Sequence, residues 1–173
     1  MAHFLHSILS RTIRKSHHLS LALSWTFGLG FGGFVFRYAG SHLASWMPLA
    51  YSCQPSIPGL LISTLLPFLF SAFAVYFSAP KLLPWICFCK AFLLGYVCCG
   101  IFAASANGGW LVRYLFLFTD LWGAALLYHY CSRHISGVRA FSPGVFGIYG
   151  CFLMAAALVD HRFILPLLQR CLS

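Results

Sequence analysis

Two ionisable side chains lie inside long apolar stretches of this sequence. Lys90 falls within Pro84–Ser105, and Asp120 falls within Trp110–Tyr130. Each stretch has about the 20 residues that a helix needs to cross a bilayer. A charge at that depth costs roughly 2.5–3.5 kcal/mol on insertion scales, so such a residue normally faces a partner or a water-filled cavity. Because a short turn joins the two stretches, antiparallel packing would bring Lys90 and Asp120 within roughly two helical turns in depth.

Asp120 has three possible roles: a structural contact inside the membrane, a contact with a partner's helix, or a transport site. Lys90 could extend its long stem toward the headgroups, whereas the short side chain of Asp120 is too deep to reach either surface. Transport pathways usually use chains of carboxylates and His, or repeated halves with broken helices. The only other acid in the chain is Asp160, and the sequence contains no internal repeat that we can find. We therefore favour a contact over transport.

No pattern typical of catalysis, metal binding or cofactor binding stands out. The H-E-x-x-H, G-x-S-x-G and P-loop patterns are absent, and the His residues mostly flank the apolar stretches. Gly28, Gly30 and Gly33 match G-x-G-x-x-G formally, but neither the preceding strand nor the later acid of a nucleotide site is present. Most of the eight Cys lie inside apolar stretches, where Cys behaves as a small hydrophobe. We expect a protein that is not an enzyme and has no metal and no cofactor.

The composition predicts an integral membrane protein. Hydrophobic residues make up 61% of the chain and charged residues only 8%, whereas soluble domains carry about 25% charged residues. The net charge is +9, but the cations stand singly at the ends of apolar stretches, as topology determinants do. We therefore expect the lipid bilayer, and not nucleic acid, as the main partner of these charges.

The apolar stretches predict an all-α, polytopic helical bundle with about five transmembrane helices. Residues 1–18 form a cationic amphipathic segment on the cytoplasmic side, and residues 19–173 form one transmembrane domain. The balance of flanking cations places the N-terminus inside, with a long outer connection between the first two spans. The predicted spans are Leu19–Tyr38, Gly59–Ser78, Pro84–Ser105, Trp110–Tyr130 and Phe141–Val159.

Small residues at helical spacing predict where these helices pack closely. Gly28 and Gly32 are four residues apart in the first span, and Gly144 and Gly147 are three apart in the last. Small residues on one helix face let two backbones approach in a membrane. Both pairs are therefore predicted to line helix contacts.

Two short motifs resemble the stage II sporulation protein M family. The segment from Lys90 to Gly95 is similar to the family's basic-Gly-x-x-x-Gly step, and Asp120, four residues before Ala124, is similar to its acidic residue followed by small residues. The sequence departs from the family where Ala91 replaces a glycine and where Lys and Asp stand for the usual Arg and Glu. The likeness covers residues 19–130, and it makes Gly95 a further candidate for helix packing.

The resemblance implies a non-catalytic scaffold in the cell membrane of an endospore-forming bacterium. Such a protein recruits cell-wall hydrolases during engulfment of the forespore, so its partners would be membrane or extracytoplasmic proteins, peptidoglycan hydrolases among them. Two alternatives stay open. One is a small transporter or channel, oligomeric, that uses Asp120; the other is the membrane subunit of an ABC-type exporter. A homo-oligomer is compatible with each.

Overall fold

The computed structural model describes residues 2–39, 57–104, 110–135, 141–164 and 166, and within these ranges it is helical without any strand. The prediction of an all-α protein is therefore confirmed for this part of the chain. The predicted outer connection falls largely on residues 40–56, which lie outside the described residues. The helices are α1 (Ala2–Ala39), α3 (Ile57–Tyr76), α4 (Leu83–Ala104), α5 (Trp110–His134) and α6 (Pro143–Val159), with a 3-10 turn η1 (Pro80–Leu82) and a π turn η2 (Asp160–Ile164).

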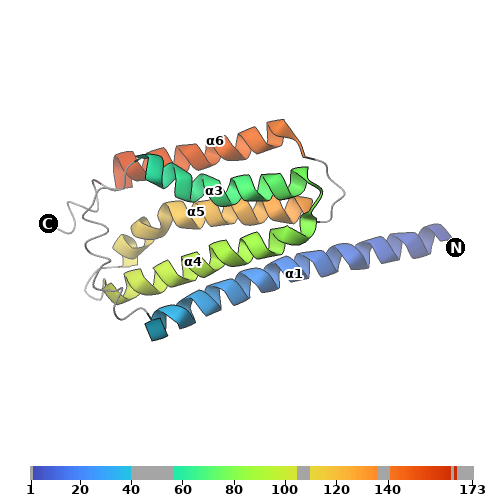
Figure 1. Ribbon diagram of the computed structural model, residues 1–173, viewed down its shortest axis with the longest axis horizontal. Coiled ribbons are helices and arrows are strands. Elements are labelled where there is room, and N and C mark those ends of the chain that lie inside the picture. The colour runs from blue at the N-terminus through green and yellow to red at the C-terminus, as the bar shows by residue number, and fades with distance from the viewer. Residues whose placement is uncertain (1, 40–56, 105–109, 136–140, 165, 167–173) are drawn as a thin grey trace.

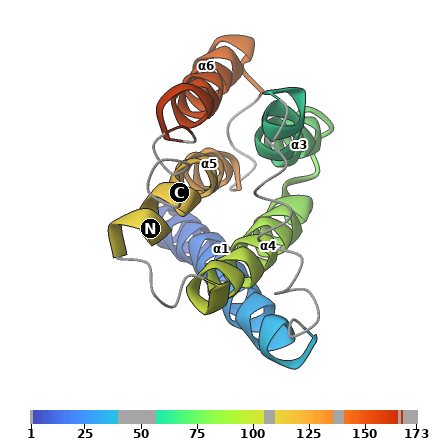
Figure 2. The same cartoon turned by 90° about the vertical axis from the view of Figure 1, so that its left-hand side faces the viewer.

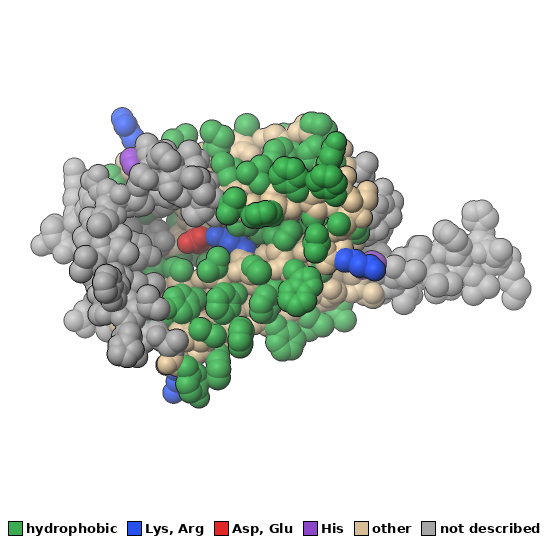
Figure 3. All heavy atoms as spheres, in the orientation of Figure 1, with side chains coloured by type: hydrophobic (Ala, Val, Ile, Leu, Met, Phe, Trp, Pro, Cys, Tyr) green, Lys and Arg blue, Asp and Glu red, His purple; other side chains and the backbone are tan. Residues whose placement is uncertain are grey.

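Within the residues that the structure describes, three helices are long and apolar enough to cross a membrane. These stretches are Ser16–Tyr38, Pro80–Ala103 and Pro143–Ile164, and the described part of α3 adds a shorter apolar helix. Large hydrophobic side chains cover much of the outer surface (Figure 3). A surface of this kind fits a membrane protein because lipid tails, unlike water, solvate apolar side chains. α1 continues unbroken through residue 18, so the predicted amphipathic segment is part of the first helix and not a separate element.

The helices lie side by side in two groups that share α4 (Figure 1). α1 runs along α4 and makes by far the most extensive contact in the molecule. α3, α5 and α6 pack against one another on the other side of α4, as the end-on view also shows (Figure 2). Among the described helices, α4 thus packs extensively against α1, less against α5 and sparsely against α3.

Buried side chains hold the second group together. Phe68 of α3 is almost fully buried, and the centre of its ring lies within 6 Å of the ring centres of Tyr130, Phe146 and Tyr149. These rings come from α5 and α6, so one aromatic cluster fixes three helices. A second, smaller cluster, Leu94 and Ile101 of α4 with Leu117 and Ala124 of α5, joins α4 to this group.

The turn from α3 to α4 is a Schellman motif. The Ala79 N–H donates to the Ala74 carbonyl and the Ser78 N–H to the Val75 carbonyl. Ser78 takes a φ of 54°, the left-handed conformation that glycine usually provides at this position. This tight turn sets α3 and α4 antiparallel and leaves Lys81 exposed at its tip.

Candidate functional site: an ion pair beside an apolar groove

Three glycines lie where α1 contacts α4. They fix where α4 lies against α1, and so they also fix the location of Lys90. A Cβ atom built on Gly28 would stand 2.6 Å from the Phe88 carbonyl oxygen, and one on Gly32 would overlap the Phe92 carbonyl. From the opposite helix, a Cβ on Gly95 would overlap the Leu29 carbonyl oxygen. The two backbones can approach this closely only because these side chains are absent. The structure thus places three of the glycines singled out in the sequence in one seam.

The prediction that Gly144 and Gly147 line a packing face is wrong for the described part of the chain. Both residues are exposed, and no described atom lies within 4 Å of a Cβ built on either. α6 packs through Tyr149, Leu153 and Ala157, which recur every four residues on the opposite face of the helix. Bulky side chains, and not small residues, therefore make this contact.

Lys90 and Asp120 form the single ion pair found among the described residues. The Lys90 Nζ atom lies 2.6 Å from Asp120 Oδ1 and donates a hydrogen bond to it, joining α4 to α5. The two side chains differ in burial, since 8% of the lysine but 38% of the aspartate is exposed. One carboxylate oxygen is thus held from inside the bundle, while part of the carboxylate faces outward.

The surroundings of this pair are apolar. Ala91 and Leu94 flank Lys90 on α4 and are buried, and Thr119 beside Asp120 is buried with a hydroxyl that has no hydrogen-bond partner among the described groups. Figure 3 shows acidic and basic side chains next to each other in the middle of an otherwise hydrophobic face. The ion pair carries no net charge, and the second carboxylate oxygen of Asp120, which has no partner among the described groups, can still accept hydrogen bonds.

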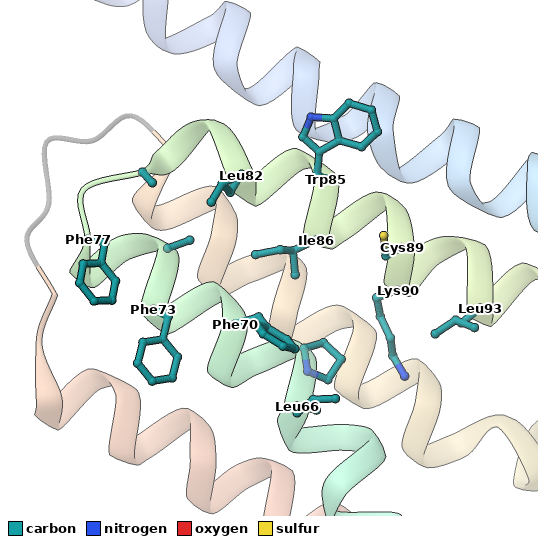
Figure 4. Close-up of a pocket in the computed structure, with 13 residues that line it drawn as sticks. Leu66, Phe70, Phe73, Phe77, Leu82, Trp85, Ile86, Cys89, Lys90 and Leu93 are labelled. Atoms are coloured by element: carbon teal, nitrogen blue, oxygen red, sulfur yellow. The ribbon is translucent and has the colours of Figure 1, made fainter.

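An apolar groove of about 540 Å³ lies between α3 and α4, and Lys90 is among the residues that line it. Figure 4 shows the lysine stem leaving α4 beside this groove and its amine pointing away toward α5. The groove was not predicted from the sequence, although large apolar residues at helical spacing on both helices are a signal for it. Its walls are formed mainly by Leu66, Phe70 and Phe73 of α3 with Phe77 just after it, and by Leu82 of η1 with Trp85, Cys89 and Leu93 of α4.

Two further sets of polar groups link the helices. The Tyr149 hydroxyl and His129 Nδ1 share a short hydrogen bond between α6 and α5. The Cys131 thiol meets the thiol of Cys87 and the hydroxyl of Ser71 in a fully buried contact among three helices. In the part of the chain that the structure describes, no three His, Cys, Asp or Glu residues lie close enough to hold a metal ion.

In its described part, the chain is an all-α protein with several helices apolar enough to span a membrane. This part has one ion pair, which is partly exposed on an apolar face. Comparison of this chain with protein-family models, curated proteins and solved structures found no match. The likeness to the stage II sporulation protein M family therefore rests on the two short motifs around Lys90 and Asp120 alone.

Proposed function

We propose that this chain is a multi-pass membrane scaffold without catalytic activity that binds partner proteins through the outward-facing carboxylate of Asp120. All five helices would cross the bilayer, with the N-terminus in the cytoplasm. Asp120 would then lie about 15 Å from the start of α5, near the middle of a hydrocarbon layer about 30 Å thick.

The partly exposed side chain of Asp120 carries this proposal. Hydrocarbon offers no hydrogen-bond donor, so an exposed carboxylate oxygen at that depth is costly unless another molecule covers it. Lys90 donates to one oxygen of Asp120, and no described group donates to the other. A partner helix that presents a Ser, Thr, Asn or basic side chain would supply the missing donor.

The same carboxylate could serve a small transporter or the membrane subunit of an exporter. Pairing with Lys90 disfavours this alternative, because the lysine already occupies the position of a cation beside Asp120. Asp120-dependent solute flux in liposomes would favour the first of these alternatives, and co-purification of an ATPase would favour the second.

Affinity purification from native membranes in a gentle detergent, followed by mass spectrometry, tests the proposal. We expect specific membrane or extracytoplasmic proteins with the native chain and their loss with the double variant Lys90→Met, Asp120→Leu. This variant replaces both charges by apolar groups of similar size, so it should insert and fold, which thermal unfolding checks. Recovery of peptidoglycan hydrolases or their anchors would extend the proposal to the recruitment role that the resemblance implies.

Two outcomes would contradict the scaffold. One is recovery of the same partners with the folded double variant, because Asp120 would then not be the contact. The other is recovery of the native chain only as a stable homo-oligomer, which would favour a transporter.

A further inference from the structure

We infer that the groove between α3 and α4 binds one acyl chain of an anionic phospholipid, with the phosphate group held near Lys81. This inference shares with the proposed function the placement of α3 and α4 in a bilayer, but it requires no protein partner. It concerns the part of α4 between the helix start and Lys90, not the carboxylate of Asp120.

The width of the groove suits an extended chain. Its first wall extends from Leu66 of α3 to Phe77, just after the end of that helix, which is about 16 Å along a helix axis. Division of the volume of about 540 Å³ by this length gives a mean cross-section of about 34 Å², whereas a helix 10 Å wide needs about 80 Å². A helix 10 Å wide would therefore lie over the groove, whereas an extended hydrocarbon chain would fit within it.

The lining of the groove is suited to hydrocarbon. The phenyl rings of Phe70 and Phe73 and the indole of Trp85 border it, and each of these side chains is more than half exposed (Figure 4). Lys90 is the one charged residue in the lining, and its amine is engaged by Asp120. Neither wall thus presents a free polar group that would favour a polar ligand.

A positive charge near one end of the groove favours a lipid with an anionic headgroup. Ala79 and Leu82 border the end at the helix turn, and Lys81 lies between them in sequence, exposed at the tip of that turn. No described acidic side chain pairs with Lys81. The orientation that the flanking cations predict places this tip on the cytoplasmic side, where anionic lipids attract Lys and Arg. A phosphate at Lys81 and a chain in the groove would occupy both features with one molecule.

Tryptophan quenching by brominated lipids tests this inference on the full-length protein in vesicles. A variant that keeps Trp85 as its single Trp reports on the groove, and a variant that keeps Trp122, also exposed but on α5 and not among the groove-lining residues, reports on ordinary boundary lipid. Phosphatidylglycerol and phosphatidylcholine, each brominated near the head of its chains, are compared in a phosphatidylcholine background. We expect brominated phosphatidylglycerol to quench Trp85 with a relative affinity about fivefold above that of the choline lipid, the effect of one cation near the surface.

Two further variants decide the outcome. Lys81→Gln should bring the preference at Trp85 down to that at Trp122, and Ala74→Phe, which fills the groove wall, should weaken quenching of Trp85 by both lipids. Equal preference at Trp85 and Trp122, or a preference unchanged by Lys81→Gln, would overturn the inference. Loss of protein partners in the purification experiment would leave these results unaffected, so the two tests can fail independently.

Discussion

The two sides of α4 are packed in opposite ways. Toward α1, glycines bring the backbones so close that added Cβ atoms would strike carbonyl groups. Toward α3, large side chains point outward and leave a groove of about 540 Å³. Lys90 stands at the boundary, with its stem along the groove and its amine on Asp120.

This difference separates a structural contact from a surface available for binding. The α1–α4 seam is complete within the chain, because backbone atoms of both helices already fill it. The α3–α4 side is incomplete, because an apolar groove and a partly exposed carboxylate need lipid or protein to cover them in a membrane. We therefore propose that the chain binds its partners on the α3–α4 side, which we call the open side, and that the α1–α4 seam mainly stabilises the fold.

Substitution in the seam should have the largest effect on stability. Gly32→Leu would force α1 and α4 apart, and we expect a loss of about 3 kcal/mol in the free energy of unfolding, at the upper end for overpacked contacts. Reversible unfolding in detergent micelles measures it. Gly30→Leu is the matched control, since no described atom lies within 4 Å of a Cβ at Gly30, and its effect should stay below about 0.5 kcal/mol. Equal losses for both variants would show that the seam is not close-packed.

Removal of one partner of the ion pair should have the next largest effect. Asp120→Ala leaves the buried amine of Lys90 without its acceptor, and we expect a loss of about 2 kcal/mol, below the 3–5 kcal/mol of fully buried pairs because Asp120 is partly exposed. The double variant Lys90→Met, Asp120→Leu should recover to within about 1 kcal/mol of the native chain. A double-mutant cycle that uses unfolding in micelles gives the coupling. Additive losses would mean that Lys90 and Asp120 do not interact.

Substitution in the turn that joins α3 to α4 should have the smallest effect on stability, and this effect should be stabilising. Ser78 holds a φ of 54°, so Ser78→Gly should relieve backbone strain and stabilise the protein by about 0.5 kcal/mol after the larger chain entropy of glycine is counted. Ala79→Gly is the control, because Ala79 has a φ of −107° and gains nothing from glycine. Thermal unfolding of the two variants compares them. A loss of stability with Ser78→Gly would contradict the left-handed turn.

Much of the helical layout could be predicted from the sequence, because membrane-length apolar runs leave few alternatives. The predicted span Pro84–Ser105 differs from α4 by one residue at each end, while α1 begins far before the predicted Leu19. The cationic residues ahead of that point form helix as readily as loop, so composition alone did not place the boundary.

Contacts between helices were less predictable than the helices. Gly28 and Gly32 lie in a seam, whereas Gly144 and Gly147, with similar spacing, lie on an exposed face. The spacing of glycines shows that one face of a helix carries small side chains, but it does not show which face contacts a neighbouring helix. The groove was missed for the same reason, since it depends on how far apart α3 and α4 stand.

Carbodiimide labelling tests most directly the central claim that a partner covers Asp120. Dicyclohexylcarbodiimide dissolves in membranes and modifies carboxyl groups, and Asp120 and Asp160 are the two acidic residues of this sequence. Mass spectrometry would compare the modification of Asp120, either as the retained label or as the amide that the adjacent Lys90 amine forms when it displaces dicyclohexylurea, relative to the label on Asp160, between native membranes and purified protein in liposomes. We predict that Asp120 is protected in native membranes and labelled after purification. Equal labelling of Asp120 in both preparations would show that no partner covers it and would contradict the proposed scaffold.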